Sequence, residues 1–188
     1  MARNVRVLHC TPEDVFEVLS DGWLYPAWVV GASRMRAVAS TWPAQGSELH
    51  HSFGVWPMLI NDRTIVEQCG PPRRMVLRAR GWPMGEARVT LELRPHGEDC
   101  IVRIQEEPVA GPGRFVPRPI MDALVRWRNT ETLHRLAYLS EGRAAVRARR
   151  GSPSPSPSPS PGPAPSPPAS PSLGPAQSPA PDAEARES

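Results

Sequence analysis

A short helical stretch, six strand-like segments and one long final helical pattern follow one another in this chain, and their order constrains the fold more than any other feature. The stretch Asp14–Trp28 begins as an amphipathic helix, continues into an aromatic-rich second turn and leads directly into a strand. The long helical pattern Ile120–Glu141 comes only after the strands. With a first strand at Asn4–His9, this order predicts an α+β fold in which a curved antiparallel sheet holds a long helix over a cavity.

The boundaries of these elements have local signals. Thr11 and Pro12 have the residue types of an N-cap and a first helical position, and acidic residues follow in the first turn. Alternating apolar and polar residues, with Gly or Pro between the runs, predict strands at Arg34–Ser40, Glu48–Phe53, Asn61–Gln68, Arg73–Arg80, Glu86–Arg94 and Cys100–Glu106. Consecutive strands at such short spacing predict an antiparallel meander, preceded by two short helices that follow the first strand.

The C-terminal segment differs sharply in composition from the rest. From Ser152 onward the chain is rich in Pro, Ser, Ala and Gly, and beyond Arg150 only Leu173 is a large apolar residue. Such a segment cannot bury enough apolar surface to offset the entropy cost of ordering. We therefore predict one folded domain over residues 1–143 and a disordered Ser/Pro-rich tail over residues 144–188.

Charge and cysteine content exclude several functional classes. All 22 basic residues are arginine, and the net charge at pH 7 is +3, too small for a nucleic-acid partner. The arginines at 143, 147, 149 and 150 indicate a solvated helix end or, as the alternative, contact with an anionic surface. The three cysteines have no paired spacing, and no phosphate loop or nucleophile motif is present, so we expect no metal and no cofactor.

No apolar signal core follows Met1, and no run of residues reaches membrane-spanning length. The expectation is a cytoplasmic protein without integral membrane association.

His51 is the first candidate for chemistry. It shares the inward phase of its strand with Phe53, and the neighbouring His50 is predicted to point outward. An inward imidazole is either a hydrogen-bonded core histidine or a general acid or base acting on a bound carbonyl compound. Both alternatives remain open from the sequence.

Arg128 is the second candidate, because it falls near the middle of the apolar stripe predicted for the final helix. That stripe consists of Ile120, Met121, Leu124, Val125, Trp127, Leu136, Tyr138 and Leu139. A buried guanidinium needs a partner, and Glu106, on the inward phase of the last strand, is the natural one, with Glu131 as a further possible member. The pair either closes one end of the cavity structurally or lets Arg128 bind a carboxylate, phosphate or enolate.

Aromatic and methionine side chains on or beside the elements that face the cavity are candidates for ligand binding. They are Trp28, Phe53, Trp56, Met58, Trp82, Met84, Met121 and Trp127. Tryptophans in a pocket favour flat apolar ligands, and the alternative is that they fill the core. The Trp-Pro-Met sequences at 56–58 and 82–84 lie in predicted turns, where adaptable loops at a pocket rim would account for them.

Four segments carry a resemblance to a known family: 15–28, 29–35, 42–51 and 128–136. They resemble the polyketide cyclase/dehydrase-like branch of the START-like (SRPBCC) superfamily, and the likeness covers Val5 to Glu141. It implies the helix-grip fold, a seven-stranded antiparallel sheet around a long C-terminal helix with a deep apolar cavity. Members include lipid and sterol carriers, aromatic polyketide cyclases, oxygenase domains and co-chaperone-like proteins; the iron ligands of the oxygenase members are not evident here.

The resemblance leaves three functions open. The first is binding of a small hydrophobic or aromatic molecule, lipid or polyketide-like, in the internal cavity. The alternative is a polyketide cyclase/dehydratase-type enzyme, in which His51 moves protons, Arg128 stabilises an enolate and Glu106 completes the catalytic set. The third is a co-chaperone-like interaction module, which requires an exposed apolar patch on the sheet.

Overall fold

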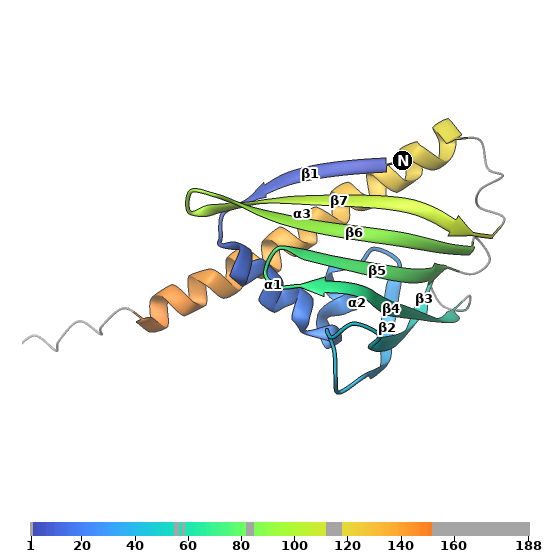
Figure 1. The fold of residues 1–188 in the computed structure, drawn as a ribbon, viewed down its shortest axis with the longest axis horizontal. Coiled ribbons are helices and arrows are strands. Elements are labelled where there is room, and N and C mark those ends of the chain that lie inside the picture. Colours follow the sequence, from blue (N-terminus) through green and yellow to red (C-terminus); the bar gives the residue numbers. More distant parts are fainter. Residues whose placement is uncertain (1, 55–56, 58, 82–84, 112–117, 152–188) are drawn as a thin grey trace, which may run out of the picture. The chain divides into compact units, whose positions relative to one another are not determined.

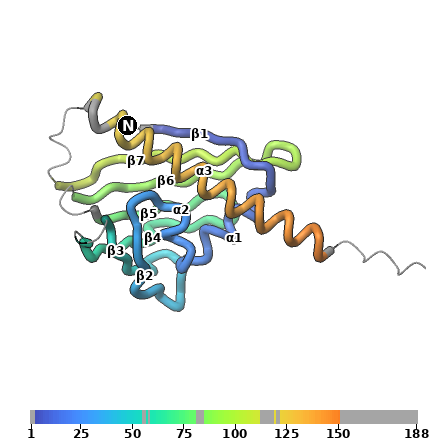
Figure 2. The backbone as a smooth tube through the Cα atoms, turned by 180° about the vertical axis from the view of Figure 1, so that it is seen from behind, coloured from blue at the N-terminus to red at the C-terminus, as the bar shows by residue number. Residues whose placement is uncertain are grey.

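The computed structural model describes residues 2–54, 57, 59–81, 85–111 and 118–151. Its elements, in chain order, are β1 (Ala2–Leu8), α1 (Pro12–Ser20), η1 (Gly22–Leu24), α2 (Tyr25–Trp28), β2 (Ala32–Val38), β3 (Glu48–Phe53), β4 (Ile60–Gly70), β5 (Arg74–Gly81), β6 (Gly85–His96), β7 (Asp99–Ala110) and α3 (Arg118–Gly151). The helices lie on one face of the sheet (Figure 1), and the view from behind shows α3 crossing that face (Figure 2). We call this the inner face and the opposite one the outer face.

The strands form one seven-stranded antiparallel sheet in the order β1-β7-β6-β5-β4-β3-β2. Strands β2 to β7 form a meander, and β1 pairs with β7, so β1 and β2 are the edges. The predicted helix-grip architecture, with two short helices after the first strand and a long C-terminal helix, is confirmed. The last strand is longer than the predicted Cys100–Glu106 and runs to Ala110, because its pairing with β6 continues past Glu106.

The first helix begins as its sequence predicts. Thr11 is the N-cap, its hydroxyl accepts from the backbone N–H of Asp14, and the Asp14 carboxylate accepts from the backbone N–H of Thr11. This reciprocal pair satisfies two backbone donors that a helix start otherwise leaves unpaired. The buried side of α1 packs into the core through Val15, Phe16, Val18 and Leu19.

Helix α3 differs from the prediction in its length and in the face that it buries. It continues to Gly151, past the predicted end at Glu141. The sequence predicts Leu124, Trp127 and Tyr138 in the buried stripe, but they are 57%, 65% and 79% exposed, so that prediction is wrong. The side chains that α3 does bury are Asn129, Thr132, Leu133, Leu136, Ala137 and Ser140. The predicted stripe mixes the two sides of the helix: Leu136 is buried and Leu139 packs against the core, as predicted. Polar residues interrupt the inward row and the opposite side carries large apolar ones, so apolar periodicity alone does not choose the buried face.

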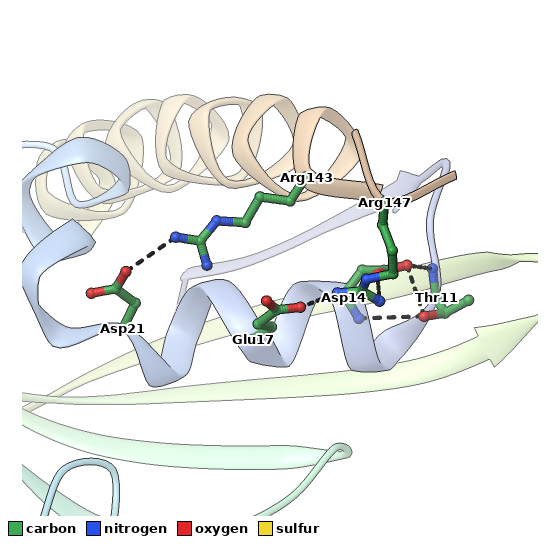
Figure 3. Close-up of polar contacts among 6 residues, drawn as sticks. All are labelled: Thr11, Asp14, Glu17, Asp21, Arg143 and Arg147. Atoms are coloured by element: carbon green, nitrogen blue, oxygen red, sulfur yellow. Dashed lines mark hydrogen bonds and ion pairs between the residues drawn. The ribbon is translucent and has the colours of Figure 1, made fainter. Parts of the chain in front are cut away.

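Two arginines near the C-terminal end of α3 join this helix to α1, as Figure 3 shows. Arg143 donates to Asp21 at 3.1 Å, and Arg147 pairs with both Asp14 and Glu17. We call these five residues the α1–α3 clamp. Asp14 and Glu17 lie on one side of α1 because residues three positions apart share a helix face, and Asp21 is the C-cap residue that follows the helix. Two of the four arginines predicted to be a solvated helix end are therefore engaged in ion pairs.

The outer face of the central strands carries ion pairs. Arg78 and Arg88 both approach Glu67, and Arg103 pairs with Glu92. Depressions in this face are lined mainly by polar and charged side chains. This charged surface counts against an interaction module that uses the sheet, since such a module needs an exposed apolar patch.

None of the helices in the described part of the chain is both long and apolar enough to cross a lipid bilayer.

Candidate functional site

Three polar side chains from three elements form a buried hydrogen-bonded chain on the inner face. The hydroxyl of Thr64 lies 3.0 Å from the hydroxyl of Tyr25 and 3.1 Å from Nε2 of His51. The rings of Tyr25 and His51 also lie against each other, with centroids 5.0 Å apart. We call this group the Tyr–Thr–His chain. Because the Thr64 hydroxyl can donate only one proton, the direction of its two hydrogen bonds follows the tautomer of His51.

Strand register brings these side chains together. In the antiparallel pair β3–β4, His51 lies opposite Asp62 and Leu49 lies opposite Thr64. Side chains alternate between the two faces along each strand, so all four point to the inner face, and all four are buried. Tyr25 reaches Thr64 from α2, which follows the first helix after a single turn of 3-10 helix.

Burial sets the protonation states of this chain. It lowers the pKa of His51, outweighing the nearby Asp62 carboxylate, which raises it. Burial also raises the pKa of Tyr25 to about 12. His51 and Tyr25 are therefore both neutral at physiological pH.

His51 points inward, as its strand phase predicts, and is 2% exposed. Its Nε2 is hydrogen-bonded, whereas Nδ1 is buried and has no partner with hydrogen-bond geometry among the described residues. The backbone of Ser52 lies near the imidazole and raises its pKa, but it forms no hydrogen bond of normal geometry with Nδ1. His51 is thus only half satisfied as a core histidine.

Arg128 pairs with Glu106, as the sequence predicts. Its Nη2 donates to Oε2 of Glu106. The Arg128 side chain is 32% exposed and that of Glu106 only 9%, so Arg128 lies at the edge of the buried face of α3 and not near its middle. Both charges act on the pKa of Tyr25, Arg128 lowering it and Glu106 raising it, which places the ion pair and the Tyr–Thr–His chain in one electrostatic environment. Glu131 pairs with Arg135 instead.

The predicted aromatic residues separate into three groups. Trp28 is buried and packs edge-to-face on Tyr25, with ring centroids 5.3 Å apart. Phe53 is half-buried and covers Gly31, where φ is 100° and an added Cβ would come within 2.2 Å of the ring, so this contact requires glycine. Trp127 points away from the inner face, and its predicted place facing the cavity is wrong. Outside the described residues lie Trp56, Met58, Trp82, Met84 and the side chain of Met121.

Part of the inner face beside these groups is less completely covered than the rest. Ala79 and Val89 continue the inward rows of β5 and β6, Ala79 opposite Thr64 and Val89 opposite Glu106, and Ala87 lies opposite Ala79. All three side chains are only half-buried. The inward residues of these strands nearer to α1 are fully buried, so among the described inward residues of β5 and β6 the partial exposure occurs at the end that carries the polar group.

Sequence reasoning missed Tyr25, Thr64 and Asn129. Asn129 is 1% exposed, and its Nδ2 is buried without a hydrogen-bond partner among the described residues. Thr64 had a usable signal, since it shares a strand phase with the buried Val66. Asn129 had none, because α3 carries apolar residues on both sides and periodicity does not choose between them.

No cluster of three or more metal-binding side chains occurs in the part of the chain that the structure describes. Cys10 and Cys100 are buried thiols whose pKa values burial raises to about 12 and about 11. Protonated thiols of this kind are poor nucleophiles and poor metal ligands.

The family described as "Polyketide cyclase / dehydrase and lipid transport" matches residues 2–141. The chain belongs to this family. The matched region contains the Tyr–Thr–His chain and the Arg128–Glu106 pair, and it ends before the clamp arginines of α3. Membership confirms the resemblance seen in the sequence. No curated protein sequence matches the chain.

Solved structures with the same fold include one protein from a biosynthetic pathway and one from a biosynthetic locus. The di-domain ARO/CYC StfQ from the steffimycin pathway has a TM-score of 0.61 and 11% identity, covering 77% of this chain and 51% of that one. DynU16, from the dynemicin biosynthetic locus, has a TM-score of 0.56 and 19% identity, covering 76% and 48%. A conserved protein from Geobacillus kaustophilus has a TM-score of 0.59 and 12% identity, covering 74% and 94%. At these identities the likeness shows the helix-grip fold alone.

Proposed function

We propose that this protein binds a small hydrophobic or aromatic molecule, lipid-like or polyketide-like, between the inner face of the sheet and α3. The observation that carries the proposal is the incomplete cover of the inner face at Ala79, Ala87 and Val89. Small apolar residues there adjoin a buried polar group, which is the usual composition of a ligand pocket. The family's description, naming polyketide cyclases, dehydrases and lipid transport, supports the same conclusion.

The unpaired polar atoms of the interior favour a ligand that carries oxygen. His51 Nδ1 and Asn129 Nδ2 are both buried without partners among the described residues. A buried polar atom without a hydrogen bond costs about 1–3 kcal/mol. A ligand with carbonyl or hydroxyl groups would recover part of that cost, whereas a pure hydrocarbon would not.

A pocket-filling substitution tests the proposal. The full chain would first be examined by native mass spectrometry, with extraction of any co-purified lipophile, and then titrated with emodin, a flat hydroxylated anthraquinone. Ala87→Leu should weaken emodin binding by about tenfold or more and leave the melting temperature unchanged or higher, because Leu would occupy open space. Ala145→Leu, on the exposed side of α3, is the matched control and should change neither.

The opposite result would contradict the proposal. If the inner face is already filled at Ala87, the larger side chain overpacks the core, costs about 1–3 kcal/mol and lowers the melting temperature. Emodin binding that is absent in the wild type, or equal in the wild type and Ala87→Leu, would also contradict it.

The second candidate function is a polyketide cyclase/dehydratase-type enzyme. The observation that favours it is a neutral, buried imidazole in the same electrostatic environment as Tyr25 and Arg128. His51 would accept a proton from the carbon beside a carbonyl group, and Arg128 would stabilise the enolate through guanidinium nitrogens other than the Nη2 that binds Glu106.

Deuterium exchange separates the two functions. Benzoylacetone exchanges its acidic carbon-bound protons in D₂O, and proton NMR measures the rate. The enzyme requires the wild type to accelerate this exchange and His51→Gln to lose the acceleration while still binding emodin. A wild-type rate equal to that of buffer would reject the enzyme and leave the binding function standing.

A further inference from the structure

The side of α3 that points away from the sheet carries a line of exposed large apolar side chains. Leu124, Trp127 and Tyr138 are more than half exposed. At about 100° per residue, the three directions fall within about 60° of one another. Leu124 and Tyr138 are separated by about 21 Å along the helix axis at about 1.5 Å per residue. Because they point away from the inner face, these side chains have no part in the proposed pocket.

Basic residues lie beside this line and beyond its C-terminal end. At about 100° per residue, Arg135 lies beside the line, where Glu131 balances its charge, and the exposed Arg149 and Arg150 follow the line. The carboxylate of Glu141 accepts from the backbone N–H of His9. After Glu141 the helix has no acidic residue. The exposed side of α3 is therefore apolar along its middle and positively charged toward its C-terminal end.

We propose that this surface, which we call the α3 outer face (Leu124, Trp127 and Tyr138 with Arg135, Arg149 and Arg150), docks on an anionic lipid bilayer. Trp and Tyr prefer the headgroup level of a membrane, where a ring contacts hydrocarbon and its polar edge contacts water. Arginine pairs with lipid phosphate groups. A helix with Trp and Leu on one side and arginines beside them lies flat in such an interface.

The size of the surface favours a membrane over a second protein. A whole aromatic side chain buries about 150–250 Å², so three partly exposed side chains remain below the roughly 800 Å² per partner of a stable protein interface. Binding to a bilayer requires no such minimum area, because the attraction between arginines and anionic headgroups adds to the free energy gained by each inserted side chain. Docking of this kind goes beyond the proposed pocket and does not depend on which molecule the pocket binds.

Vesicle co-sedimentation of the full chain tests the proposal. Vesicles of phosphatidylcholine with about 30% phosphatidylglycerol should bind the protein at least about tenfold better than vesicles of phosphatidylcholine alone. About 0.5 M NaCl should remove most of this preference, since screening shortens the reach of exposed charges. Replacing Arg149 and Arg150 by Gln should weaken binding by about fivefold for each arginine.

A pair of tryptophan variants distinguishes binding through the α3 outer face from nonspecific binding of any exposed aromatic side chain to lipid. Trp127→Ala should weaken binding to the anionic vesicles by about tenfold. Trp23→Ala is the matched control, because Trp23 is 62% exposed but belongs to η1, and it should bind as the wild type does. Both variants should keep the wild-type melting temperature, since neither side chain is buried.

Three results would overturn the proposal. The first is no preference for phosphatidylglycerol. The second is equal weakening by Trp23→Ala and Trp127→Ala. The third is a dimer, seen by light scattering, that Trp127→Ala dissociates, which would make this surface an interface between two copies of the chain.

Discussion

Replacing Arg128 by Met and Glu106 by Gln should destabilise the protein to different extents, because the two partners of this ion pair are buried to different extents. The Glu106 side chain is 9% exposed and that of Arg128 is 32% exposed. Removal of Arg128 leaves a carboxylate in the interior without its cation. Removal of the carboxylate charge leaves a guanidinium that can still reach water from the edge of α3.

The expected costs follow from this difference. Breaking a fully buried pair costs about 3–5 kcal/mol, and breaking an exposed pair costs about 0–1 kcal/mol. The burial of Glu106 is close to that of a fully buried partner, whereas Arg128 is partly solvated, so the pair is weaker than a fully buried one. We therefore expect Arg128→Met to lower the free energy of unfolding by about 2 kcal/mol. For Glu106→Gln we expect less than about 1 kcal/mol. In a domain of this size, about 2 kcal/mol lowers the melting temperature by about 4–8 °C.

Urea unfolding followed by circular dichroism measures both free energies, with unchanged slopes as the check on two-state behaviour. The double variant should be more stable than Arg128→Met alone, since it removes the stranded carboxylate. If Glu106→Gln costs as much as Arg128→Met, or if the double variant is the least stable of the three, then burial of Glu106 is not what makes the pair important and the reasoning fails.

Three further predictions concern other residues. Trp28→Ala should cost about 3–5 kcal/mol in urea unfolding, whereas Trp127→Ala should stay within about 0.5 kcal/mol of the wild type; similar costs would contradict the assigned faces of the two rings. Burial lowers the pKa of His51 in the folded state, so as the pH falls the unfolded chain binds a proton at His51 before the folded protein does. The stability that comes from keeping His51 neutral is therefore complete above about pH 6.5, and it is lost as the pH falls through the lowered pKa of the folded state. Unfolding free energies between about pH 7.5 and about pH 5.5 should thus fall more steeply for the wild type than for His51→Gln, by up to about 1.4 kcal/mol per pH unit. Arg147→Gln, which removes the partner of the buried Asp14, should cost about 1 kcal/mol at low salt, and a cost that does not shrink in about 0.5 M NaCl would argue against an ionic origin.

Some features of the fold and the site were predictable from the sequence because they depend on residues close together in the chain. The capping box at Thr11 involves a residue only three positions away, and the bounds Glu48–Phe53 were predicted as the structure has them. The inward direction of His51 follows from strand alternation, which is a property of the strand itself. Pairing of Arg128 with Glu106 was also predictable, since a buried charge restricts its partner to an opposite charge on the facing element.

The tertiary structure alone decided which side of α3 is buried. The helix has apolar residues on both sides, Leu133 and Leu136 on one and Trp127 and Tyr138 on the other, and periodicity cannot choose between two apolar lines. Packing against the sheet makes the choice, and it carries Asn129 into the interior.

Local pattern could not predict the Tyr–Thr–His chain either. Its members come from α2, β3 and β4, and the distances between them depend on the register of β3 on β4 and on how α2 packs against both strands. The sequence by itself therefore determined the elements, their order and the inward phase of each strand. Which side chains meet across the interior was decided only by long-range packing, because hydrogen bonds between distant segments exist only after the sheet and helices have assembled.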